Sequence, residues 1–245
     1  MATQISAFFQ CSDGSFISLV NNDVSASTTT EITTGGTGLA QVSGVSIGQA
    51  YVGKTITSGM FKVSTEDAST GVALFGYVIG PNGSIKTIVQ GGGGTAGEFP
   101  KLVKPLRLVQ GDRFEARWDA AADGGTQEAA LSVYCSDGTC DVFTATMVND
   151  TKTAMLNKDG ATVGQALDGK MIMGALAIAS TVFDINESQA GVGGYYIESA
   201  DGQLKAVYPP ITGDNSSAYP SFPQYQVYPV RITQNDTLSV MGSNS

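Results

Sequence analysis

The sequence predicts an all-β protein built from two tandem, duplicated antiparallel β-sandwich domains. Apolar and polar residues alternate along much of the chain, or apolar residues form short β-branched runs, and turn residues interrupt them at intervals of roughly eight to twelve residues. A series of short motifs from the first half returns in the same order in the second half. At 245 residues the chain is long enough for two domains, each with its own core.

Five short motifs carry the duplication. The pairs are Cys11-Ser12-Asp13-Gly14 with Cys135-Ser136-Asp137-Gly138; Gly48-Gln49-Ala50 with Gly164-Gln165-Ala166; Gly76-Tyr77 and Ile79 with Gly194-Tyr195 and Ile197; Phe99-Pro100 with Phe222-Pro223; and Pro105, Arg107, Gln110 and Asp112 with Pro229, Arg231, Gln234 and Asp236. One short match arises easily by chance, whereas five in the same order indicate a copied domain. We therefore predict a first sandwich over 1–122 and a second over 123–245, joined near 119–127.

The strands expected in the first copy follow from its apolar runs. They are Phe16–Val20, Gly59–Val63, Val72–Ile79, Ile85–Val89, Leu102–Val109 and Arg113–Trp118. Asn82-Gly83 separates the third run from the fourth, and Asn-Gly is typical of a type I′ hairpin turn, which needs positive φ at both central residues. The stretch 46–63 is rich in β-branched residues, so we predict strand there.

The second copy supplies a matching set of strands. They are Val142–Met147, Lys170–Ile178, Gly193–Ile197, Leu204–Tyr208, Tyr225–Thr233 and Thr237–Met241. Asp201-Gly202 is expected to form the same type I′ turn. The stretch 162–179 could be mistaken for a long amphipathic helix, but its three glycines cost about 1 kcal/mol each in a helix, so we predict no long helix there.

Charge excludes several classes of partner. The net charge is −9, and no run of Lys or Arg forms a stripe that could neutralise phosphates, so we expect no direct nucleic-acid binding and no docking on anionic membranes. No apolar stretch approaches the roughly 20 residues of a membrane-spanning helix. Residues 1–4 lack the basic and apolar regions of a signal peptide, so synthesis in the cytoplasm of a cell is expected.

Histidine is absent from the chain, which removes Ser-His-Asp and Cys-His mechanisms and the commonest zinc and haem ligands. Carboxylates remain as possible acid/base groups, but no pattern pairs them across a cleft as glycoside hydrolysis requires. The carboxylates considered are Glu66, Asp67, Glu115, Asp119, Glu187 and Glu198. The acidic loops at 21–23 and 157–160 lack EF-hand spacing. We therefore predict no catalytic residue, no cofactor and no metal site, and a protein that is not an enzyme.

The candidate binding surface is an aromatic cluster late in the second copy. It comprises Tyr208, Tyr219, Phe222, Tyr225 and Tyr228. Because prolines stiffen this segment, its aromatic rings suit stacking on sugars, anchoring of a subunit interface, or packing within the protein. The sequence leaves these alternatives open.

The three cysteines are too few for a disulfide scaffold. Cys135 and Cys140 flank a hairpin-like turn and could form a disulfide across it, whereas Cys11, the counterpart of Cys135, has no partner in its own copy. Reduced thiols are the ordinary state of a cytoplasmic product. Both states therefore remain open for this pair.

A strand with Pro-x-Arg, followed by a Gly-Asp or Asn-Asp turn before the last strand, occurs at 105–118 and again at 229–241. With this repeated feature, the tandem architecture resembles the double jelly-roll major capsid proteins of tailless icosahedral viruses. The resemblance implies two jelly-roll-like sandwiches in each chain and three chains in a pseudo-hexagonal block. It also implies a virion structural protein that self-assembles, as homotrimers, into an icosahedral shell, with itself and other virion proteins as partners.

The alternative function is a carbohydrate-binding or adhesin-like module that uses the Tyr- and Pro-rich loop 208–228. A doubled binding protein is expected to repeat its site. This chain repeats turns and strand boundaries and varies its loops, which favours the structural block.

Overall fold

A computed structural model describes residues 4–22, 24–34, 44–64, 71–91, 101–120, 127–148, 151–179, 191–208, 211–212 and 224–243. The chain divides into two compact units. Within the described ranges, unit 1 holds residues 4–120 and unit 2 holds residues 127–243. The fold is all-β, with curled and nearly closed sheets.

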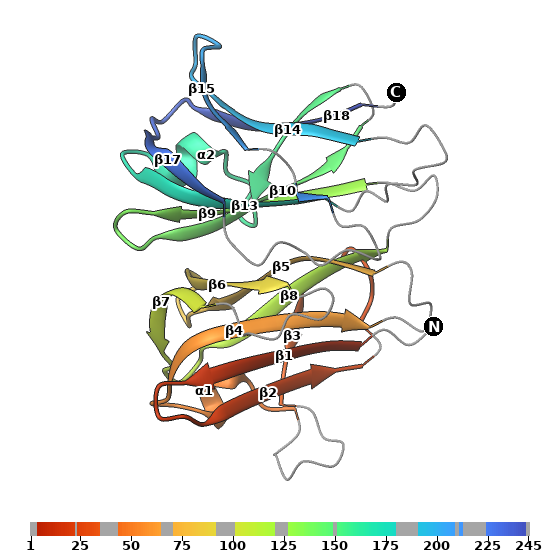
Figure 1. The fold of residues 1–245 in the computed structure, drawn as a ribbon, viewed down its shortest axis with the longest axis vertical. Coiled ribbons are helices and arrows are strands. Elements are labelled where there is room, and N and C mark those ends of the chain that lie inside the picture. The colour runs from red at the N-terminus through yellow and green to blue at the C-terminus, as the bar shows by residue number, and fades with distance from the viewer. Residues whose placement is uncertain are drawn as a thin grey trace. The chain divides into compact units, whose positions relative to one another are not determined.

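Unit 1 is built from strands that pair antiparallel in two groups. Its elements are β1 (Gln4–Cys11), β2 (Phe16–Asn21), β3 (Thr30–Ile32), α1 (Ile47–Ala50), β4 (Thr55–Ser64), β5 (Gly71–Ile79), β6 (Ile85–Gly91), β7 (Lys101–Arg107) and β8 (Arg113–Ala120). The two groups have the orders β2-β1-β4-β7 and β3-β8-β5-β6 (Figure 1). One edge of β4 pairs with β7 near its start and, in parallel, with β6 at Met60 and Phe61. This shared edge joins the two groups into one curled sheet.

Unit 2 repeats this plan. Its elements are β9 (Gln127–Cys135), β10 (Cys140–Met147), β11 (Lys152–Ala154), β12 (Leu156–Asn157), α2 (Val163–Leu167), β13 (Met171–Ala179), β14 (Gly191–Glu198), β15 (Leu204–Tyr208), β16 (Ile211–Thr212), β17 (Gln224–Arg231) and β18 (Thr237–Ser243). The two groups are β10-β9-β13-β17 and β11-β18-β14-β15. The short strand β12 extends the first group beyond β10, and β16 pairs in parallel with the end of β13.

Each strand predicted from the sequence overlaps an observed strand, but the long strands β1 and β9 and the short strands β3, β11, β12 and β16 were not predicted. In β1 the side chains of Ile5, Ala7 and Phe9 are fully buried, and the residues between them face outward. This alternation is a strand signal that the doublet Phe8-Phe9 obscures. The two long missed strands, β1 and β9, lie in the middle of a sheet, between β2 and β4 and between β10 and β13.

One helical turn precedes the long strand in each unit, so the prediction of strand throughout 46–63 is wrong, while 162–179 holds a five-residue helical turn followed by a strand rather than a long helix. In unit 2 a capping box starts the helix: the Thr162 hydroxyl accepts the Gln165 backbone N–H, and the Gln165 side chain accepts the Thr162 backbone N–H. A Cβ on Gly164 would lie 2.5 Å from the carbonyl oxygen of Gln234. The glycine therefore permits a close approach of two backbones, which outweighs its poor helix propensity.

The turns after β5 and β14 are not of type I′, contrary to the prediction. In each of them φ is +80° at the glycine, Gly83 or Gly202, and the preceding residue has an ordinary negative φ. The Gly80 N–H donates to the Ser84 carbonyl at 2.9 Å, which closes a three-residue loop with a bulge at the glycine. Asn82 Oδ1 accepts the N–H of Ser84, and this local bond explains the Asn or Asp before glycine.

Equivalent pairings align the two units residue by residue and correct one motif match. Tyr77 pairs with Ile88 across the β5–β6 hairpin, and Tyr196 pairs with Val207 across the β14–β15 hairpin. Tyr77 therefore corresponds to Tyr196, and the predicted match to Tyr195 is off by one residue. Because a shift of one residue moves a side chain to the other face of a sheet, Tyr195 points into the core and Tyr77 does not.

The corrected alignment shows that the two cores place a large aromatic side chain on different strands. Gly76 takes the position of Tyr195, and a Cβ there would lie 2.9 Å from the rings of both Phe61 and Phe114. Ala177 takes the position of Phe61 in unit 2. Phe61 pairs with Ala7 on β1, and Ala177 pairs with Leu131 at the equivalent position of β9. Unit 1 thus fills its core with a ring from β4, and unit 2 with a ring from β14, at similar total volume.

Candidate functional site

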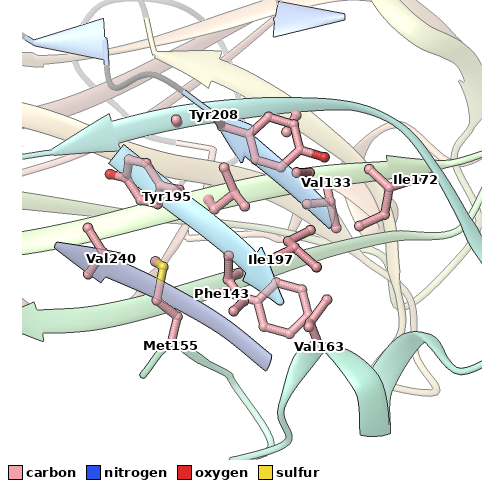
Figure 2. Close-up of a cluster of buried hydrophobic side chains, with 14 of the residues drawn as sticks. Val133, Phe143, Met155, Val163, Ile172, Tyr195, Ile197, Tyr208 and Val240 are labelled. Atoms are coloured by element: carbon pink, nitrogen blue, oxygen red, sulfur yellow. The ribbon is translucent and has the colours of Figure 1, made fainter. Parts of the chain in front are cut away.

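The predicted aromatic surface includes a tyrosine that belongs to the core. Tyr208 is 2% exposed and lies with Tyr195 among buried aliphatic side chains of unit 2 (Figure 2). The Tyr195 hydroxyl donates to the Ile178 carbonyl at 2.6 Å. Burial raises the pKa of both phenols above their usual range. The Tyr208 ring is therefore not available for stacking on a sugar.

The rest of that predicted surface is only partly described. Tyr219 and Phe222 lie outside the described residues, as does the motif pair Phe99-Pro100 with Phe222-Pro223. Tyr225 and Tyr228 belong to β17, of which only the backbone is described at these positions.

The three cysteines are free thiols in the structure. Cys140 pairs with Tyr134, so its side chain shares a face of the hairpin with Tyr134, while Cys135 points to the opposite face and joins the core. Side chains on opposite faces of a hairpin do not meet the geometry of a disulfide bond. Burial raises the pKa of Cys135 to about 11 and that of Cys140 to about 12.

The carboxylates considered above remain dispersed. Glu115 accepts the Tyr77 hydroxyl and pairs with Arg113, Glu198 pairs with Lys152, and Asp119 accepts the Ser27 hydroxyl. Glu66, Asp67 and Glu187 lie outside the described residues. Within the described ranges, no three Cys, Asp or Glu side chains gather as metal ligands.

The groups that both units repeat are two ion pairs that tie loops to strands. In the first, Asp112 of unit 1 is fully buried and accepts Lys86 Nζ at 2.6 Å, and in unit 2 Asp236 is buried and accepts Lys205 Nζ at 2.5 Å. The Oδ2 atom of each aspartate also accepts a backbone N–H of its own turn, from Val109 or Thr233. These carboxylates therefore hold together the turn before the last strand and the β5–β6 or β14–β15 hairpin.

The electrostatics of Asp236 follow from this arrangement. Burial alone raises the pKa of its carboxyl group, but the hydrogen bonds from Lys205 and Thr233 outweigh burial and leave the pKa below its usual range. The carboxylate is thus charged near neutral pH and serves the fold.

The second repeated pair lies at an exposed hairpin tip. Asp13 pairs with Lys54 in unit 1, and Asp137 pairs with Lys170 in unit 2. The lysine hydrogen bond, supported by those of Ser15 or Thr139, lowers the pKa of each aspartate. Exposed pairs of this kind contribute little to stability.

One sheet face of unit 2 differs from these packed regions because apolar side chains stand exposed on it. It is the outward face of β11-β18-β14-β15, here called the outer face, and carries Tyr196, Val207, Met241, Leu204 and the Lys152–Glu198 ion pair. Leu204, Val207 and Met241 are 56%, 44% and 41% exposed. An apolar group of this kind, with charges beside it, has the composition of an interaction surface.

Comparisons of the chain with protein-family models, with curated proteins and with solved structures found no match. Neither of the helices in the described part of the chain has the length and apolar composition needed to span a membrane.

Proposed function

We propose that the protein is a viral structural protein, a capsid building block that self-assembles into a shell. The observation that carries the proposal is the strand order that both units share. Supporting observations are the chemical nature of the groups that both units repeat and the exposed apolar face of unit 2.

The strand order supports a jelly-roll origin for each unit. A jelly roll places eight antiparallel strands in two sheets of four, connected as two Greek keys. Its last strand lies between its first and third strands, which is the place that β1 takes between β2 and β4. If β1 is counted as the last strand of unit 1, after β8, the strand orders β2-β1-β4-β7 and β3-β8-β5-β6 are those of the two sheets of a jelly roll. The same holds in unit 2 if β9 is counted after β18.

The repeated contacts support a structural role. Asp112 and Asp236 each fasten a turn to a hairpin, and Gly48 and Gly164 each allow a helical turn to rest on backbone atoms of the turn before the last strand. Each of these groups is engaged in packing or in an internal ion pair. The two copies thus share the parts that specify the fold, as expected of a block that is used for its shape.

The mass and shape of the purified protein test the proposal. We expect native mass spectrometry and light scattering to find trimers or larger species at micromolar concentration, and negative-stain electron microscopy to find closed particles or regular arrays. A protein that stays monomeric under these conditions would contradict the proposal.

The carbohydrate-binding alternative receives less support, because Tyr208 packs in the core of unit 2. A glycan array separates the two functions. Glycan binding that is lost in Tyr225→Ala would favour the alternative, while the structural role predicts no specific binding.

A further inference from the structure

We infer that the outer face of unit 2 is a self-association surface, on which a second copy of the chain packs the same face about a two-fold axis. The inference depends on the proposed function in one respect, namely that the partner is another copy of this chain. It adds the surface through which two copies meet.

The arrangement of side chains on the outer face suits contact between sheets. Tyr196 lies in one row with Val207 on β15 and Ser239 on β18. In the next row Met241 stands opposite Gly194, and the Tyr196 ring lies over this glycine, since a Cβ there would be 3.1 Å from Tyr196 Cζ. The middle of the face thus presents Tyr196, Val207 and Met241 around the buried Ser239, and a second sheet packs on such a face at a spacing of about 10 Å.

The equivalent positions of unit 1 show that this apolar pair is retained in both copies. Tyr77 and Ile88 occupy the places of Tyr196 and Val207. An aromatic residue beside a β-branched residue, kept at the outward positions of both copies, is typical of a surface used for packing. In unit 2 Val207 is 44% exposed and Tyr196 is partly buried.

The charges of the face suit a second copy as the partner. Lys152 and Glu198 lie on the same face and pair with each other across it, and their side chains are 45% and 21% exposed. A two-fold interface uses the same patch twice, so it favours a patch that carries one charge of each sign. In such a dimer Lys152 of one copy can meet Glu198 of the other, and a strongly charged partner of one sign gains nothing from this face.

Sedimentation velocity on the full chain tests the inference. Val207→Asp places a charge in the apolar centre, and we expect it to weaken self-association roughly a hundredfold. The matched control is Val148→Asp, which changes an exposed valine of unit 2 (56% exposed) that is not on the outer face, and which should associate like the wild type. Circular dichroism and thermal melting establish that both variants are folded.

A charge exchange gives a second measurement that does not depend on Val207→Asp folding. Lys152→Glu and Glu198→Lys should each weaken association about tenfold, and the double variant should restore it, because a two-fold contact needs only opposite signs. Association unchanged in Val207→Asp, or no recovery in the double variant, overturns the inference. If Val207→Asp still forms the trimers and particles of the wild type, the outer face is excluded while the proposed function stands; a wild-type protein that never associates overturns both.

Discussion

The hydroxyl of Thr233 donates a hydrogen bond of 2.8 Å to Oδ1 of Asp236. Valine stands at the equivalent position of unit 1, so Oδ1 of Asp112 is buried and, among the described residues, has no hydrogen-bond partner. The two units thus share a buried aspartate–lysine ion pair, in which the aspartate Oδ1 accepts a hydroxyl in unit 2 and lacks that donor in unit 1. Unit 1 carries the cost of a buried acceptor that is left unsatisfied.

Val109→Thr should therefore stabilise unit 1 by about 1 kcal/mol, because the new hydroxyl supplies the missing donor. Val109 is 44% exposed, so little apolar burial is lost. Thr233→Val should destabilise unit 2 by a similar amount. Denaturant unfolding measures the change in the free energy of unfolding for both variants. Val52→Thr, at another exposed valine, is the control. If Val109→Thr does not raise the free energy of unfolding, another group already satisfies Asp112.

Acid should weaken unit 2 through Asp236. The pKa of this carboxyl is lowered in the folded state, so its contribution to stability is present above its unfolded pKa of about 4 and is lost as the pH falls through the lower folded value. Asp236→Asn should unfold at lower temperature at pH 7, and the gap to the wild type should narrow below about pH 4. Melting temperatures across pH measure this, with the exposed Asp159→Asn as control; a gap that stays constant with pH would refute the prediction.

Gly164→Ala should destabilise unit 2, although alanine is the better helix former by about 1 kcal/mol. The added Cβ would lie 2.5 Å from the Gln234 carbonyl oxygen and 2.7 Å from backbone atoms of Asp236, and backbone cannot move aside as a side chain does. We expect a loss of about 3 kcal/mol or more. Gln49→Ala, at an exposed position of α1, should change stability by less than about 0.5 kcal/mol.

Tyr195→Phe should cost about 1 to 3 kcal/mol, because it removes the donor to the buried Ile178 carbonyl and leaves that oxygen unsatisfied. The neighbouring Tyr196→Phe is the matched control, since Tyr196 lies on the outer face. Equal stability of the two variants would indicate that the Ile178 carbonyl finds another donor.

The cysteines should remain reduced and react slowly in the folded protein. Burial raises the pKa of Cys135 to about 11 and that of Cys140 to about 12, so the reactive thiolate is scarce at pH 8. Thiol titration should find little reaction before unfolding and all three thiols afterwards. An intact mass that rises by two hydrogens on reduction would reveal a disulfide and contradict the register that separates Cys135 from Cys140.

The sequence was most informative where a residue's own backbone conformation determines the local structure, as in tight turns. The positions of the Asp-Gly and Asn-Gly turns and the strand boundaries beside them could be predicted, though not the turn type, because glycine at positive φ depends on local geometry alone. The face of Tyr208 could not, since a five-residue strand alternates too briefly to identify which side is covered. The one-residue shift between Tyr77 and Tyr196 had the same origin: Gly-Tyr occurs in both copies, and only the pairing of whole strands sets the register.

The candidate surface was harder to predict because it depends on contacts between distant segments. Lys152 and Glu198 are 46 residues apart in the chain, and sheet pairing alone brings them onto one face with Val207. No local pattern marks such a combination. The buried aspartates Asp112 and Asp236 were noticed as repeated turn residues, but their lysine partners lie in another hairpin and carried no motif of their own.

The placement of β1 has a consequence for how the chain arose. Gln4 pairs with the last residue of β4, and Ala120 pairs with the first residue of β5, so the described part of unit 1 begins and ends against two strands that follow one another in the chain. A domain whose two ends lie together can be copied in series by a short genetic fusion, and residues 121–126 are all that separates β8 from β9. Tandem duplication of a gene for such a domain yields a foldable product in a single step, and the two halves are then free to diverge.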